Sequence, residues 1–370
     1  MSVEQEAGVD PVRARLRQVH RAASELRRGV PVVVDGSDPL LILAAETAGH
    51  DALAELETLA GARPMLILAP ARAAAILRSP MPADGDAVAV TLPDSLYQIE
   101  VYQSLADPTA TQPAVRGMLQ ARAAPSLADA AIALSKIGRL LPALLTVPLP
   151  AAAHTVELVT VPAADILEYA KSEVAGLRQI VSADVPLTDA PDSRVVAFRS
   201  DGSAIEHLAI VIGRPEAQDA PLVRIHSECF TGDLLGSMRC DCGEQLRGAI
   251  RRMAQDGAGV LLYLAQEGRG IGLVNKLRAY RLQDRGLDTM DANRVLGWGA
   301  DERNFLIGAT MLRLMGIDRV RLLTNNPDKL DAMIACGIEV TGREPHMIAP
   351  NGVNDEYLAT KAARFGHMLD

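Results

Sequence analysis

Hydrophobic positions in the first half of the chain follow two alternating patterns. Residues 11–28 place Leu, Val and Ala on one face of a helix, and the apolar run 30–36 after them is typical of a short buried strand. Further strand-like runs (MLILAP, AVAVTL and PALLTVPL) alternate with helical ones (ALAELETLAG and LADAAIALSKIG) up to about residue 180. This alternation predicts an α/β domain.

The segment 182–194 interrupts this pattern, because it is rich in Pro, Asp and Ser. We interpret it as a linker between a domain at 1–181 and a second domain at 195–370. The second domain begins with two strands of a predicted hairpin, at 195–200 and 207–213, and a third strand at 222–226. Helices and strands alternate after it. The predicted fold class is therefore α/β and α+β, in two domains whose mixed sheets are covered by helices.

Composition narrows the possible partners. The 370 residues are 49% hydrophobic but only 3% aromatic, and the net charge is −9. Such a charge argues against a broad surface for nucleic acid or for an anionic membrane, although a local basic pocket for a phosphorylated small molecule is compatible with it. The chain has no apolar run long enough to span a bilayer and no signal-peptide pattern at its start. We therefore expect a cytoplasmic protein with reduced thiols.

Three of the four cysteines lie in one short segment, 226–246. Ten residues separate Cys229 from Cys240, and a single residue separates Cys240 from Cys242. Three thiolates and a water are typical of a catalytic zinc site. Two alternatives stay open at this point: a structural zinc site with a fourth ligand such as His226, and three buried thiols without a metal.

Two strand-to-helix turns carry features of anion sites. The loop 267–272 (EGRGIG) lies between a strand and a helix, and Arg269 adds a planar cation. At the second turn a strand ends at Thr324, Asn326 is a candidate helix cap, and Lys329 follows. A plain turn and a well-capped helix with a solvated lysine are the simpler interpretations.

Three further residues are candidates for proton transfer or charge stabilisation. Asp301 and Arg303 stand where a helix is expected to begin, and Tyr280 lies on the helix after the glycine loop. From the residues alone, a helix cap for Asp301, a surface cation for Arg303 and a core side chain for Tyr280 are the simpler interpretations.

Five blocks of this half resemble the GTP cyclohydrolase II family: RIHSECFTGDLLGSMRCDCGEQL, YLAQEGRGIGLVNKLRAYRLQDRGLDT, LGWGADERNF, RLLTNNPDK and NDEYLATKAARFGH. The resemblance covers residues 195–370. It implies a zinc-dependent enzyme that opens the guanine ring of GTP in the first step of riboflavin synthesis. Formate and pyrophosphate are released, and 2,5-diamino-6-(5-phosphoribosylamino)pyrimidin-4-one is formed.

The resemblance also assigns roles to residues. It implies zinc ligands at Cys229, Cys240 and Cys242, a proton acceptor at Asp301, a nucleophile at Arg303 and an active-site tyrosine at Tyr280. It implies nucleotide contacts at Arg224, Ile225, His226, Ser227, Glu228, Gln245, Glu267, Gly268, Arg269, Thr289, Thr324 and Lys329. Mg2+ is expected with the triphosphate, which carries several negative charges. The family suggests a homodimer.

The nucleophilic role of Arg303 conflicts with its chemistry. A guanidinium with a pKa above about 12 is a poor nucleophile unless it is deprotonated. An electrostatic clamp on the transferring phosphoryl group is the competing interpretation.

The front half is similar in outline to 3,4-dihydroxy-2-butanone 4-phosphate synthase. Where that family has a Glu-rich loop, this chain has GSDPLLIL, and only Asp35 and Asp38 precede Glu46. RAAPSLA replaces the family's Arg-x-Gly-His-Thr-Glu motif. We predict that this half has lost the synthase activity and serves as a scaffold or a dimer surface.

Other functions remain open on the sequence. The chain could act in another pathway that opens purines or GTP, or stop at a partly hydrolysed product. It could also be a non-catalytic GTP-binding regulator. A zinc-knuckle nucleic-acid module is disfavoured by the negative charge and the few aromatic residues.

Overall fold

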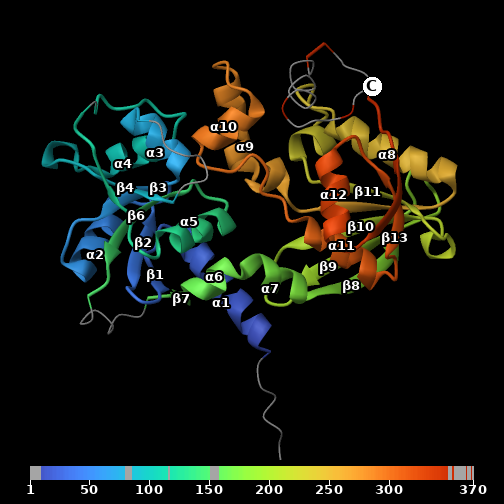
Figure 1. Cartoon of the computed structure of the whole chain (residues 1–370), viewed down its shortest axis with the longest axis horizontal. Coiled ribbons are helices and arrows are strands. Elements are labelled where there is room, and N and C mark those ends of the chain that lie inside the picture. Colours follow the sequence, from blue (N-terminus) through green and yellow to red (C-terminus); the bar gives the residue numbers. More distant parts are fainter. Residues whose placement is uncertain are drawn as a thin grey trace, which may run out of the picture. The chain divides into compact units, whose positions relative to one another are not determined.

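The computed structural model describes residues 10–79, 86–115, 117–150, 158–348, 352–353, 364 and 368. The chain divides into two compact units (Figure 1). Unit 1 comprises residues 1–176, 201–203 and 293–298, and unit 2 comprises residues 177–200, 204–292 and 299–370. This agrees with the predicted two-domain class of mixed sheets covered by helices.

Unit 1 is built on a seven-stranded sheet with the strand order β5-β4-β3-β6-β2-β1-β7. The strands are β1 (Val32–Asp35), β2 (Leu40–Ala44), β3 (Met65–Leu68), β4 (Val88–Thr91), β5 (Gln120–Ala123), β6 (Ala143–Pro148) and β7 (Thr160–Pro162). The helices are α1 (Pro11–Arg27), α2 (His50–Ala60), α3 (Pro70–Leu77), α4 (Ile99–Ala106), α5 (Ala128–Ile137), α6 (Ala163–Leu167) and α7 (Tyr169–Ala175).

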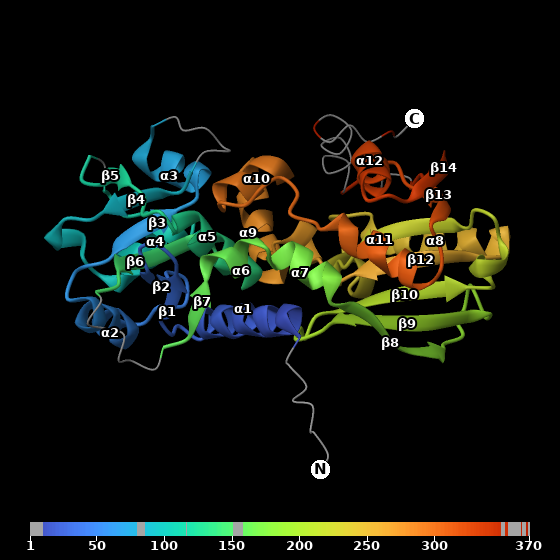
Figure 2. The ribbon, with the colours of Figure 1, turned by 60° about the horizontal axis from the view of Figure 1, so that its bottom comes forward.

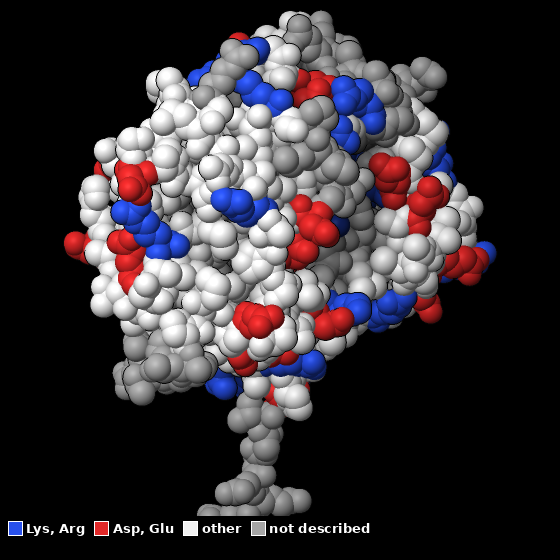
Figure 3. Space-filling model, turned by 60° about the vertical axis from the view of Figure 1, so that its left-hand side comes forward, with Lys and Arg blue, Asp and Glu red and all other residues white. Residues whose placement is uncertain are grey.

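The core of unit 1 lies between its sheet and α1 and α5. Val19 and Leu26 of α1 cluster with Leu40 and Ile42 of β2. Leu41, between the two strand residues, is also fully buried. Because successive strand residues point to opposite faces, the sheet is buried on both sides. Acidic and basic side chains are mixed among larger uncharged areas on the face shown in Figure 3.

Unit 2 contains a second seven-stranded sheet with the order β14-β13-β11-β12-β10-β9-β8. Its strands are β8 (Leu177–Asp184), β9 (Ser193–Ser200), β10 (Glu206–Ile212), β11 (Leu222–Ser227), β12 (Gly259–Leu264), β13 (Arg319–Leu323) and β14 (Glu339–Glu344). Its helices are α8 (Cys242–Asp256), α9 (Leu273–Gln283), α10 (Thr289–Val295, whose end belongs to unit 1), α11 (Phe305–Leu314) and α12 (Pro327–Ala335).

Helices cover both faces of this sheet. Leu261 of β12 packs in one cluster with Ala249 and Met253 of α8. A Cβ built on Gly308 of α11 would lie 3.4 Å from the side chain of Leu262, the next residue of the strand. Since Leu261 and Leu262 point to opposite faces, α8 and α11 pack on opposite sides of β12.

The sequence predicted a linker at 182–194, and the structure corrects this prediction. Residues 182–184 end β8, which pairs with β9 in antiparallel register from Leu177↔Ser200 to Asp184↔Arg194. Unit 2 therefore begins at Leu177, and the segment comprises the end of β8, the turn of a hairpin and the start of β9 (Figure 2). Pro, Asp and Ser are enriched in hairpin turns as well as in linkers, which explains the misleading signal. No helix in the described part of the chain combines the length and apolarity needed to cross a bilayer.

Candidate active site

Three parallel strands of unit 2 end at the same edge of the sheet. β11 lies between β12 and β13 and is parallel to both. The segments that follow them carry Cys229 after β11, Glu267 after β12 and Thr324 after β13. The carboxyl ends of parallel strands are the usual place for ligand sites in such sheets. Strand order thus gathers motifs that are far apart in the sequence.

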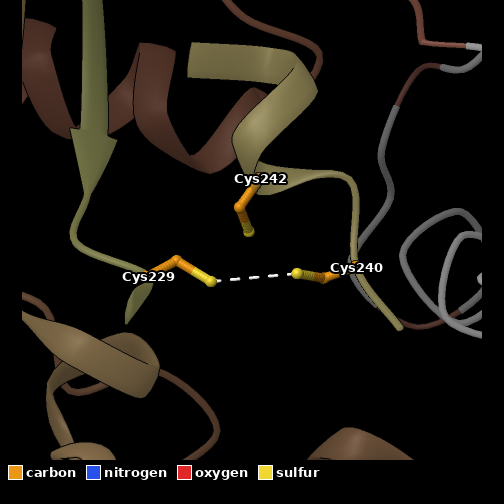
Figure 4. A group of neighbouring side chains, drawn as sticks. All are labelled: Cys229, Cys240 and Cys242. Atoms are coloured by element: carbon orange, nitrogen blue, oxygen red, sulfur yellow. Dashed lines mark hydrogen bonds between the residues drawn. The ribbon is translucent and has the colours of Figure 1, made fainter. Parts of the chain in front are cut away.

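The three clustered cysteines converge at this edge. Their sulfur atoms all lie within 4.8 Å of one another, and 3.8 Å separates Cys229 Sγ from Cys240 Sγ. Figure 4 shows the side chains pointing toward a common space from the end of β11, from the loop before α8 and from the start of α8. All three are free thiols. Two sulfurs each about 2.3 Å from one tetrahedral zinc ion would be about 3.8 Å apart, so the observed spacing fits such an ion.

A glycine leaves room for this convergence. A Cβ built on Gly232 would lie 2.8 Å from Cys240 Sγ, 2.9 Å from Cys242 Cβ and 3.1 Å from Cys229 Sγ. The turn that contains Gly232 is a π-helical turn at Phe230–Leu234. Any side chain at this position would therefore push into the sulfur cluster.

The thiols do not ionise independently. Contacts with Cys240 and Cys242, together with Lys276, lower the pKa of Cys229, whereas the contact with Cys229 raises the pKa of Cys240. The same contact, followed by the contact with Cys240 and by burial, raises the pKa of Cys242. Three neighbouring thiolates repel one another, and a dication between them would remove that repulsion. The donor set therefore suits a thiophilic metal ion.

His226 is not placed as a fourth ligand. Among the described residues, the group that could share one ion consists of the three cysteines alone. His226 Nε2 lies 3.2 Å from both carboxylate oxygens of Asp233, and its ring stacks on Tyr263. Burial lowers the pKa of His226, which favours the neutral imidazole.

Asp233 was not singled out from the sequence, although it lies in the cysteine segment. Its carboxylate accepts the N–H of Cys229 at 3.0 Å and the hydroxyl of Tyr263 at 3.0 Å, in addition to its contact with His226. It thereby fixes the turn that carries Cys229 to β11 and β12.

Lys276 of α9 is a second residue that sequence reasoning missed. Its Nζ donates to Cys229 Sγ at 3.0 Å and to Glu267 Oε1 at 2.8 Å. Burial alone would lower the pKa of Lys276, but the hydrogen bonds to Glu267 and Cys229 outweigh it and raise that pKa. The spacing to Tyr280 is a signal that could have found it, because residues four apart share a helix face.

The glycine loop forms a 3-10 turn (Glu267–Gly270) whose amides are largely engaged internally. Gly270 N–H donates to Gln266 O, Gly272 N–H to Glu267 O, and Gly268 N–H to Glu267 Oε1. These three amides are therefore paired within the loop itself. Gly268 and Arg269 both have a φ of 64°, which is unusual for an arginine and gives the loop its sharp bend.

Asp301 and Arg303 form an ion pair beside this loop. Arg303 Nε donates to Asp301 Oδ1 at 2.8 Å and to Oδ2 at 3.1 Å, and Arg303 Nη2 also donates to Oδ2. The N–H of Glu302 donates to Arg269 O at 3.1 Å, which ties the segment to the glycine loop. Burial opposes the effect, but the contacts with Arg303 hold the pKa of Asp301 below its usual value.

The simpler interpretation of Asp301 as a helix cap is wrong. Helix α11 begins at Phe305, and its cap is Asn304, whose side chain accepts the N–H of Leu306 at 3.1 Å. Asp301 therefore precedes the helix and is held by Arg303 instead.

The Tyr280 side chain contacts the turn that follows Cys229 and does not serve only as a core residue. Its hydroxyl lies 3.4 Å from Thr231 Oγ1, and the Arg239 guanidinium lies 4.5 Å from its ring centroid. Burial raises the pKa of Tyr280, so the phenol keeps its proton near neutral pH. The structure thus brings Tyr280 to the same turn as Cys229.

Arg224 and Gln245, two predicted nucleotide contacts, are joined inside unit 2. Arg224 is only 5% exposed, and it donates to Leu323 O at 3.1 Å and to Gln245 Oε1. Burial lowers the pKa of Arg224 to about 10, which still leaves it charged at neutral pH. Its observed contacts brace β11 against β13 and α8.

The second predicted anion site has the expected local form. Asn326 caps α12 by accepting the N–H of Asp328 at 2.9 Å, and Pro327 is the first helical residue. Lys329 Nζ donates to Ile225 O at 2.8 Å, which brings this turn to the end of β11. Thr289 begins α10, where its hydroxyl accepts from Gln283 at 3.1 Å. The block NDEYLATKAARFGH lies outside the described residues, apart from Arg364.

Comparisons with known proteins agree with the motifs. A family model described as GTP cyclohydrolase II matches residues 178–345. The chain is 46% identical to a GTP cyclohydrolase-2 of Azospirillum brasilense over 370 residues, which covers 96% of this chain and 95% of the relative. It is 49% identical to the Pasteurella multocida GTP cyclohydrolase-2 over 197 residues, covering 53% of this chain and 90% of the relative.

A solved structure, a two-domain 3,4-dihydroxy-2-butanone 4-phosphate synthase from A. baumannii, is also similar to this chain. It is 17% identical with a TM-score of 0.33, and the match covers 83% of this chain and 93% of the other.

Proposed function

Because this chain belongs to the GTP cyclohydrolase II family, we propose that it hydrolyses GTP and opens the imidazole ring of guanine. The products proposed are formate, pyrophosphate and 2,5-diamino-6-(5-phosphoribosylamino)pyrimidin-4-one, in the first step of riboflavin synthesis. Identity of 46% across nearly the full length of a GTP cyclohydrolase-2 supports the assignment to the family. The convergence of Cys229, Cys240 and Cys242 carries the chemical part of the proposal.

These three cysteines would hold one zinc ion. When bound, zinc would supply a Lewis acid that makes a water easier to deprotonate near neutral pH. The 3.8 Å spacing between the Cys229 and Cys240 sulfurs supports this ion. Gly232 keeps the space between the sulfurs clear of side-chain atoms.

Ring opening needs proton transfer to nitrogen atoms of the guanine, which calls for a protonated group within hydrogen-bond reach. Tyr280 suits this role, because burial keeps its phenol protonated and its hydroxyl lies beside Thr231 of the cysteine turn. Lys329 and Arg269 are proposed to bind the triphosphate, together with Mg2+.

The Asp301–Arg303 pair supports the electrostatic role of Arg303 over the covalent one. A nucleophilic guanidinium must lose a proton, and Asp301 is the neighbouring acceptor. The same ion pair lowers the pKa of Asp301, so this carboxylate is a weak base. We propose that Arg303 stabilises negative charge on the transferring phosphoryl group while Asp301 orients it.

A product assay tests the proposed function. Purified protein would be incubated with GTP, Zn2+ and Mg2+, and formate, pyrophosphate and the pyrimidine would be quantified separately. All three products in equal amounts are expected. Pyrophosphate without formate would indicate a partly hydrolysing homologue, and GTP binding without any product would indicate a regulator. Cys240→Ser, which removes one sulfur, is the matched inactive control.

The front half is proposed to lack synthase activity. Glu46, the one glutamate near the altered loop, accepts the N–H of Leu141 at 2.7 Å, and Asp38 accepts from Ser126 at 3.3 Å. These contacts hold two of the three remaining carboxylates, those of Glu46 and Asp38, in hydrogen bonds with the chain itself. Formation of a four-carbon phosphate from ribulose 5-phosphate by the purified protein would contradict this. The homodimer is likewise a proposal, to be tested by light scattering.

A further inference from the structure

We infer that Lys276 is a positioning residue of the metal centre, which balances the negative charge of the thiolates by donating to Cys229 Sγ. The inference rests on the proposed zinc site and adds a residue to it. It is carried by the contact of a buried ammonium with a sulfur atom of the cluster, at 3.0 Å.

Charge is the first reason for this role. Three thiolates around one zinc ion leave a net charge of −1 in a buried place, and such a charge needs a partner. The Lys276 side chain is only 11% exposed, so its ammonium is little screened by water.

The second reason is that the Glu267 carboxylate has other hydrogen-bond donors besides Lys276. Glu267 Oε2 accepts the N–H of Phe230 at 2.6 Å, and Oε1 accepts the N–H of Gly268 at 3.0 Å. These two backbone donors already stabilise the carboxylate. Glu267 therefore serves to aim the ammonium, whose other contact is the sulfur.

The third reason is that the ammonium is held in place from several sides. An ammonium has three N–H donors, and two of them have partners here, Cys229 Sγ and Glu267 Oε1. The Tyr280 ring centroid lies 5.8 Å from Nζ, within the range of a cation–π contact. Cys229 Sγ also accepts the N–H of Gly232 at 3.4 Å, so this sulfur receives donors from two directions.

The contact with Lys276 should change the electron density on the Cys229 sulfur. A hydrogen bond from an ammonium withdraws density from a thiolate, which lowers its repulsion with the other two sulfurs. Without Lys276 the Cys229 sulfur would lose a charged donor that orients it. Changes of this kind around metal ligands reduce metal affinity by roughly 10- to 100-fold.

The test compares metal binding in four proteins: the wild type, Lys276→Met, Lys276→Arg and the double variant Lys276→Met/Glu267→Gln. Zinc dissociation constants would be measured by competition with a chromophoric chelator. Cobalt-substituted proteins would report the sulfur-to-metal charge-transfer band. Lys171→Met, at a lysine whose side chain is 77% exposed, is the matched control for loss of a lysine.

We expect Lys276→Met to weaken zinc binding by roughly 10- to 100-fold and to move the charge-transfer band to longer wavelength. Lys276→Arg keeps the charge and should restore the band. The double variant also removes the negative charge of Glu267, so it separates loss of the sulfur contact from loss of the ion pair. Its band should stay shifted, because the sulfur still lacks its donor.

Two results would overturn the inference. One is a wild-type dissociation constant and band in Lys276→Met. The other is their full recovery in the double variant, which would mean that only the ion pair with Glu267 matters. If the wild type itself bound no zinc or cobalt, the proposed function would fail together with the inference, and the chelator titration of the wild type alone would reveal it.

Discussion

Gly232→Ala tests whether the sulfur cluster depends on the absence of a side chain at position 232. The added Cβ would lie 2.8 Å from Cys240 Sγ and 3.1 Å from Cys229 Sγ, whereas ordinary contacts of a Cβ begin at 3.4 Å. Cys240 Sγ would have to retreat by about 0.6 Å, three times the tolerance of about 0.2 Å for metal–ligand distances. One sulfur would then leave the coordination distance, and we expect a loss of zinc affinity of at least about tenfold.

The rest of the protein should tolerate the change. Overpacking by one methyl group costs about 1–3 kcal/mol, which is less than the stability of a typical domain. Zinc content after gel filtration, chelator competition and GTP turnover should therefore fall together while the far-UV circular dichroism is unchanged. Gly342→Ala in β14 is the matched control, because nothing lies within 4 Å of its added Cβ. A Gly232→Ala protein with the wild-type zinc dissociation constant would refute the reasoning.

Three further changes address other parts of the molecule. Tyr280→Phe should lower kcat by roughly 10²- to 10⁴-fold with little change in zinc content, because it removes a proton donor and no ligand; an unchanged kcat in steady-state assays would contradict this. Arg303→Lys keeps the charge but loses the planar fork, so pyrophosphate release should slow, and a wild-type release rate would exclude both roles of Arg303. Burial raises the pKa of Glu173 to about 6, so the folded protein binds this proton more tightly than the unfolded chain does. The free energy of unfolding should therefore fall by up to about 2 kcal/mol as the pH rises from about 4 to about 7, and denaturant unfolding of Glu173→Gln should lack that fall; the same pH slope in the variant would disprove the assignment.

Local features were readable from the sequence because neighbouring residues determine them. The helix at 11–28 is α1, and Asn326 with Pro327 begins α12 as expected, since a cap needs only residues within one turn. The spacing of the three cysteines predicted a shared site, and the thiols do converge. The family blocks were identified, and the strands that precede them were predicted, from the sequence alone.

Two predictions were wrong where one local signal is compatible with two structures. The segment 182–194 has the composition of a linker, but pairing of β8 with β9 makes it part of a hairpin. Asp301 stands near a helix start, yet the side chain of Arg303 holds it and Asn304 is the cap. In each case the hydrogen-bond partners decided between the two structures.

The sequence by itself determined which side chains could do the chemistry: three thiols, a tyrosine and a set of cations in recognisable blocks. Only the tertiary structure decided which other residues these side chains contact. The order of β12, β11 and β13 brings the ends of three strands to one edge, and it sets Lys276 against Cys229 across 47 positions of the chain. The physical reason is that composition and periodicity report the local backbone, whereas strand order is fixed by packing of the whole sheet.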